Sequence, residues 1–156
     1  MAIPRSKVPT DGKKTFGVKF SPDGSQIALC ACRLSEEGNG YVEHIGQGTL
    51  ADGLSWLTDF LCTDDMADTT AAIAVDGRNG AAALLDRLRE YDPRQAVFST
   101  TTKDVINATT LFSQALIDKT LTHWDGGEDN AQQAFNASAL EARKRPIGSH
   151  GGWAYG

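Results

Sequence analysis

The chain has 156 residues, of which 40% are hydrophobic and 22% are charged, and its formal net charge is −5. These values are typical of one globular domain and exclude disordered and collagen-like chains. The sequence has neither an apolar stretch long enough to cross a membrane nor the apolar core of a signal peptide, so we expect a cytoplasmic protein. The negative charge argues against a free-standing nucleic-acid-binding protein, whose surface is usually basic. It is compatible with a domain that supplies carboxylates while another domain holds the DNA.

The N-terminal third of the sequence predicts an arm followed by three antiparallel strands. Residues 1–14 contain two prolines and four basic residues without periodicity, which predicts a linker or arm before a domain at 15–156. Apolar residues then alternate with other residues, and Pro-Asp-Gly at 22–24 is strong turn chemistry. The predicted strands, separated by glycine-containing turns, span residues 15–20, 26–34 and 41–47.

After the third strand, the spacing of apolar residues changes to the helical period. Helices with apolar residues at spacings of three and four are predicted to begin after Asp52, near Ala81, after Thr101 or Thr102, and at Asp129. Extended segments are predicted at 71–75, 95–98 and 121–124, and an edge strand at Trp153 and Tyr155. A three-strand meander followed by alternating helices and strands predicts an α/β fold of the RNase H-like type. This fold is a mixed sheet of five strands with helices on both faces.

Asp76 is the first candidate for chemistry. It directly follows the apolar run 71–75 and precedes a Gly-Arg-Asn-Gly loop and a helix. Its carboxylate should therefore emerge at the carboxyl end of the sheet, where open α/β sheets place their ligand crevices. The alternative is that Asp76 caps the following helix.

Further candidates are placed by the expected fold. In an RNase H-like sheet the first strand lies beside the one that ends at Asp76, so the acid at its end, Asp23, should be a neighbour. An Asp before Gly in a turn more often has a purely structural role. A third group is expected from the last helix, where Asp129 and Asn136 are the candidates. We predict catalytic roles for Asp76, Asp23 and Asn136, and two Mg²⁺ or Mn²⁺ ions held by Asp76, Asp23 and Asp129.

Five short strings occur in order from about residue 15 to the end: FGVKFSPDGS at 16–25, AVDGRNG at 74–80, LTH at 121–123, KRPIG at 144–148 and GGWAY at 151–155. Together they resemble the nuclease domain of large terminase subunits from phages and prophages of actinobacteria. The resemblance implies a metal-dependent endonuclease that cuts concatemeric double-stranded DNA during packaging inside a bacterial host. It also implies three protein partners: the terminase ATPase domain, the small terminase subunit and the portal. Asp76 matches the acid of the family's second conserved strand.

Two residues depart from the family pattern. Lys19 stands in the first strand where many terminase nucleases have Asp, and Asn136 stands where related sequences have Asp. A lysine at this position could neutralise Asp76 and suppress metal binding. The alternative function is therefore a catalytically silent RNase H-like docking module, from a terminase or a decayed prophage.

Another RNase H-like nuclease, such as a resolvase or an enzyme that cuts RNA–DNA hybrids, is a third possibility. The sequence has no G-x-x-x-x-G-K-[ST] string, so nucleotide binding through a P-loop is not expected. The basic run 143–145 has two interpretations. It contacts DNA phosphates, or it lies at the C-terminal end of the last helix, where the helix dipole favours cations.

Overall fold

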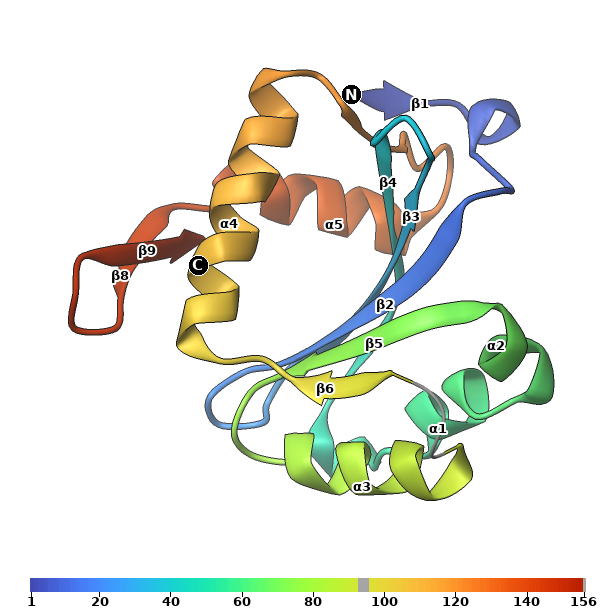
Figure 1. Ribbon diagram of the computed structural model, residues 1–156, viewed down its shortest axis with the longest axis vertical. Helices are drawn as coiled ribbons and strands as arrows, with labels where there is room; N and C mark the ends of the chain where they lie inside the picture. Colours follow the sequence, from blue (N-terminus) through green and yellow to red (C-terminus); the bar gives the residue numbers. More distant parts are fainter. Residues whose placement is uncertain (93–95, 156) are drawn as a thin grey trace.

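A central sheet organises the computed structural model, which describes residues 1–92 and 96–155. Within these residues the sheet has seven strands in the order β1-β7-β4-β3-β2-β5-β6 (Figure 1). The strands are β1 (Ala2–Ile3), β2 (Lys13–Phe20), β3 (Ile27–Leu34), β4 (Gly40–Gly48), β5 (Thr70–Asp76), β6 (Val97–Ser99) and β7 (Leu121–Trp124). The helices are α1 (Ser55–Leu61), α2 (Asp64–Thr69), α3 (Ala81–Tyr91), α4 (Thr102–Ile117) and α5 (Asn130–Glu141). A separate hairpin of β8 (Lys144–Ile147) and β9 (Gly152–Tyr155) follows α5.

The strand pairing confirms the predicted mixed sheet. Strands β2, β3 and β4 form an antiparallel meander. Strand β5 pairs in parallel with β2, and β6 pairs in parallel with β5. The predicted strand at 95–98 corresponds to β6, although residue 95 lies outside the described residues. All five expected strands are therefore present, and β7 and β1 extend the sheet beyond β4.

The hydrophobic core lies on one face of this sheet. Period-two alternation along β2 buries Phe16, Val18 and Phe20, each no more than 4% exposed. These side chains belong to one buried cluster with Leu57 of α1 and Leu84 of α3. Figure 1 shows α1 and α3 on the same side of the sheet. Burial of each large apolar side chain contributes about 1.5–3 kcal/mol, so this face supplies most of the fold's stability.

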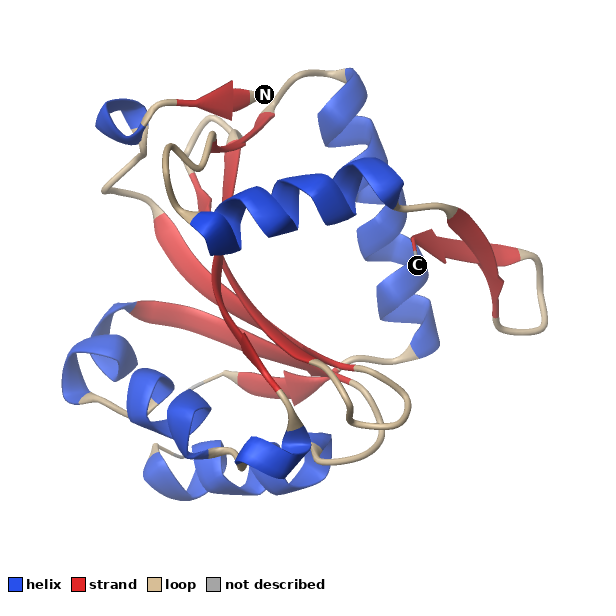
Figure 2. Cartoon of the chain, turned by 180° about the vertical axis from the view of Figure 1, so that it is seen from behind, coloured by secondary structure: helices blue, strands red, loops and turns tan. Residues whose placement is uncertain are grey.

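Helices α4 and α5 lie on the opposite side of the sheet (Figure 2). Helix α5 crosses β4, where the backbone N–H of His44 donates to the side-chain oxygen of Gln132 at 3.1 Å. Gln132 is only 1% exposed, so this hydrogen bond satisfies a buried amide. The sheet is thus covered by helices on both faces, as the sequence predicted. Lys19, the residue before Phe20 in β2, points away from the core.

The C-terminal strand and the region around Asp52 differ from the sequence-based expectations. Trp153 does not join the edge of the main sheet, because β9 pairs antiparallel with β8 in a two-stranded sheet of its own. The hairpin is held by α4, where the Tyr155 ring packs edge-on against Phe112 and its hydroxyl lies 3.2 Å from Ser113 Oγ. The helix expected after Asp52 corresponds to α1, but Asp52 does not cap it, because Leu54 is its N-cap residue. A 3-10 turn covers Leu50–Asp52, and α1 and α2 follow it.

The segment 1–14, expected as an arm, begins at the far edge of the sheet as β1 and ends in the first residues of β2. Ala2 and Ile3 pair in parallel with β7, and the N-terminal amine donates to the carbonyl of Leu121 at 2.8 Å. Arg5 donates to the Glu43 carboxylate at 2.6 Å and lies over the ring of Trp124.

Candidate functional site

Asp76 ends β5 at the carboxyl end of the central strands. Its register partner on β2 is Lys19, and the Lys19 ammonium donates to one of its carboxylate oxygens. The hydroxyl of Thr100, just after β6, donates to the other oxygen. Both oxygens are therefore engaged, one by a side chain of β2 and the other by the side chain of the residue that follows β6.

These contacts decide the charge of Asp76. Partial burial raises the pKa of its carboxyl group, but the hydrogen bonds from Lys19 and Thr100 and the positive charge of Lys19 outweigh burial. The net effect lowers the pKa below the ordinary value. The side chain is 26% exposed and that of Lys19 is 57% exposed, so the pair is a half-open ion pair at the rim of the sheet.

The loop after Asp76 is shaped by glycines. Gly77 has a φ of +136°, and a Cβ there would lie 2.5 Å from the Cβ of Phe20. Helix α3 begins after Gly80, which has the left-handed φ of +82°. The Asp76 carboxylate is turned toward Lys19 and Thr100, so it does not cap α3. The close approach of the loop to β2 holds Asp76 beside the first strand.

Asp23 lies in the β2–β3 turn, at the same edge of the sheet. The side-chain amide of Asn79, in the loop after Asp76, donates to the carbonyl of Pro22 at 2.8 Å and joins the two loops. The Asp23 carboxylate accepts from Ser21 Oγ at 2.8 Å and from the backbone N–H of Ser25 at 3.0 Å. Asp23 thus orders the turn. Its role as a ligand stays a prediction.

The hydrogen bonds of Asp23 predict that the stability of the fold depends on pH. Hydrogen bonds from Ser25 and Ser21 lower the pKa of Asp23 from 3.8 to about 2. A carboxyl group whose pKa is lower in the folded state stabilises the fold at pH values above its unfolded-state pKa. This contribution is lost as the pH falls toward the folded-state pKa. We expect Asp23→Asn, which keeps the acceptor oxygen, to lower the urea midpoint at about pH 6 but to differ less from the parent at about pH 3. An equal difference at both pH values would contradict this role.

Asn136 lies in α5, which crosses β4, and Asp129 is the residue directly before this helix. Asp129 caps α5 by accepting from the backbone N–H of Gln132 at 2.8 Å. The Asn136 amide accepts from Gln132 Nε2 at 3.0 Å and donates to the carbonyl of Asp125 at 3.2 Å. These bonds anchor α5 to the segment after β7. The structure therefore brings Asp23 and Asp76 into joined loops, whereas the α5 candidates have their partners elsewhere.

A metal centre needs several ligand atoms of suitable type close together. In the part of the chain that the structure describes, no group of three or more His, Cys, Asp or Glu side chains could hold a metal ion. One oxygen of Asp76 already receives an ammonium group. The residues as placed therefore do not form the expected two-ion site, and a single cation would reach Asp76 only by displacing Lys19.

Thr100 and Asn79 were not found from the sequence. Thr100 follows a short strand parallel to β5, and neighbouring parallel strands end at the same edge, so this rule could have found it. Asn79 acts through a carbonyl far away in the sequence, which no local pattern marks.

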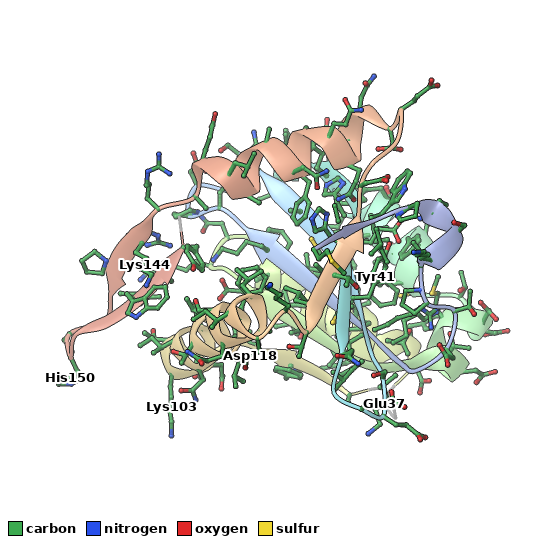
Figure 3. The ribbon with its side chains drawn as sticks, turned by 90° about the horizontal axis from the view of Figure 1, so that it is seen from above. Glu37, Tyr41, Lys103, Asp118, Lys144 and His150 are labelled. Carbon is green, nitrogen blue, oxygen red and sulfur yellow. The ribbon has the colours of Figure 1, made fainter. Side chains whose placement is uncertain are left out.

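A basic hairpin lies outside this edge. Residues 142–156 contain three of the chain's fifteen basic residues and none of its twenty acidic ones. Lys144 Nζ lies 3.9 Å from the centre of the Trp153 ring, and Arg143 donates to the carbonyls of Glu141 and Ala142 at the end of α5. Figure 3 shows Lys144 and His150 on this projecting hairpin. The positive charge of Arg143 therefore lies at the C-terminal end of α5, which is one of the two roles that the sequence suggested for the basic run 143–145.

Solved structures with similar folds include nuclease domains of phage terminases. The large-terminase nuclease domain of bacteriophage SPP1, solved with bound Mn, has a TM-score of 0.62 and 12% identity over 96% of this chain and 79% of its own. That of bacterial virus Sf6, solved with manganese, has a TM-score of 0.58 and 12% identity over 95% of this chain and 79% of its own. The large-terminase nuclease of a thermophilic phage has a TM-score of 0.55 and 8% identity, covering 94% and 73%. This chain has the RNase H-like fold of terminase nucleases.

Neither a protein-family model nor a curated protein sequence matches the chain. At 8–12% identity the structural similarity establishes the fold, and the residues of the site have to be judged from their own geometry. Among the described residues no helix is long and apolar enough to cross a membrane.

Proposed function

We propose that the chain is the metal-dependent nuclease domain of a viral DNA-packaging terminase of the actinobacterial phage type. Its substrate would be concatemeric double-stranded DNA. The observation that carries the proposal is the position of Asp76, an ionised carboxylate at the carboxyl end of the strand beside β2. Terminase nuclease domains with this fold have been solved with manganese.

The roles of the chain's own residues follow from their contacts. Asp76 would hold a single hard cation, which supplies the Lewis acidity that activates water at a phosphodiester. Thr100 orients the carboxylate through its hydroxyl group. Lys19, once released from Asp76, can neutralise a phosphate at the same edge. The ATPase domain, the small subunit and the portal are the proposed protein partners, and the ATPase domain would supply the main grip on DNA.

Cleavage of supercoiled DNA tests the proposal. We expect weak, sequence-tolerant nicking that requires Mn²⁺ or Mg²⁺ and is abolished by EDTA. The weakness follows from the net charge of −5, because few phosphate contacts are available to hold the duplex. Nicking should be compared with and without each metal ion. Tight DNA binding by this chain without metal would contradict the proposed division of labour.

A second candidate function is a catalytically silent docking module of the packaging machinery. The ion pair between Lys19 and Asp76 favours it, since an ammonium group already neutralises the central carboxylate. This candidate predicts neither nicking nor thermal stabilisation at any Mn²⁺ concentration.

A further inference from the structure

Lys19 and Asp76 are held opposite each other by the sheet itself. They are register partners on the parallel strands β2 and β5. Val75, the neighbour of Asp76, is 0% exposed, and Phe20, the neighbour of Lys19, is 1% exposed. Because successive side chains of a strand point to opposite faces, this buried side fixes both charged side chains on the other face. The ion pair is therefore built into the backbone arrangement rather than formed by two mobile surface side chains.

Because the Lys19 ammonium already neutralises Asp76, little negative charge remains there to attract a divalent metal ion. The other hydrogen-bond partner of Asp76, Thr100, is neutral. Asp23, whose turn is joined to the Asp76 loop by Asn79, is engaged by Ser21 and Ser25 in its own turn. A divalent ion that approaches Asp76 must displace the Lys19 ammonium and then remain beside this positive charge.

We propose that Lys19 is the resident cation of this edge and competes with divalent metal ions for Asp76. The parent chain then binds Mn²⁺ or Mg²⁺ weakly at Asp76, and a carboxylate at position 19 turns the pair into a divalent-cation site. The inference rests on the proposed function only in taking the Asp76 edge as the working site. It concerns metal binding, which is measured without DNA.

The decisive variant is Lys19→Asp, titrated with MnCl₂ by isothermal calorimetry in the absence of DNA. We expect it to bind one equivalent of Mn²⁺ about tenfold more tightly than the parent, or more, because a repulsive charge is replaced by a ligand. The double variant Lys19→Asp/Asp76→Asn should lose this gain, which assigns the ion to Asp76. Lys13→Asp makes the same change of charge at the exposed start of β2 and should bind like the parent.

Lys19→Gln is the control for a folding defect of Lys19→Asp, because it removes the charge and leaves a side chain of similar length. It should also bind Mn²⁺ more tightly than the parent, by a smaller factor, with an unchanged far-UV circular dichroism spectrum. Equal Mn²⁺ affinity of the parent, Lys19→Gln and Lys19→Asp would overturn the inference. A gain that survives Asp76→Asn would overturn it as well. If Lys19→Asp binds Mn²⁺ but none of the proteins nicks DNA, the inference stands and the proposed function fails.

Discussion

Replacement of Asp76 by Asn is expected to lower metal-dependent nicking by orders of magnitude. The amide keeps the size of the side chain but removes the charge that neutralises a divalent ion. The fold should lose no more than about 1–2 kcal/mol, because Lys19 is exposed enough to turn into solvent and the oxygen that accepts from Thr100 remains. A large loss of cleavage with a small loss of stability is the signature of a residue that acts in the site.

Nicking of supercoiled DNA and thermal denaturation, each with and without Mn²⁺, measure the two effects. Asp23→Asn should reduce nicking less than Asp76→Asn, and least if Asp23 only orders its turn. Asp118→Asn makes the same change at the exposed C-terminal end of α4 and should behave like the parent. Nicking at the parental rate by Asp76→Asn would show that the site is wrongly assigned. If neither parent nor variant cuts or is stabilised by Mn²⁺, the docking-module candidate is supported.

The second large effect is expected from Gly77→Ala. A Cβ at this position would lie 2.5 Å from the Cβ of Phe20, which is 1% exposed in the core. The φ of +136° is also unfavourable for any side chain. Backbone strain and overpacking each cost about 1–3 kcal/mol, so we expect the free energy of unfolding to fall by about 3 kcal/mol or more. The Asp76 loop should move away from β2 in the variant.

Gly38→Ala separates the effect of backbone strain from the effect of the steric contact with Phe20. Gly38 has a φ of +86°, but no heavy atom of the described chain lies within 4 Å of a Cβ built there. This variant should lose only the backbone part, about 1 kcal/mol. Urea denaturation of both variants gives the comparison. Equal losses would show that the contact with Phe20 does not constrain the loop.

Local sequence patterns predicted most of the fold. Alternation at Phe16, Val18 and Phe20 gave the buried face of β2, and the apolar run before Asp76 gave a strand that ends at the edge of the site. The adjacency of these strands followed from the fold type. The partner of Asp76 could be foreseen only as an alternative, because the choice between a metal ion and Lys19 depends on how the two strands pair.

Features that depend on distant contacts were not predictable. Asn79 fixes the Asp76 loop through the carbonyl of Pro22, 57 residues earlier in the chain. The two-residue strand β1 forms because β7 offers an open edge, not because its own sequence has a strand pattern. Helix α2 has six residues, too few to show a helical period.

The pairing of Lys19 with Asp76 also bears on how the chain folds. A slip of one residue between β2 and β5 would turn the side chains of one strand to the other face of the sheet. Lys19 or Asp76 would then point into the layer occupied by Phe20, Val75 and Leu84, without its partner. Burial of an unpaired charge is far costlier than the loss of an exposed ion pair. The two charges therefore penalise misaligned pairing of the central strands, and this selection against wrong registers operates whether or not the edge ever holds a metal ion.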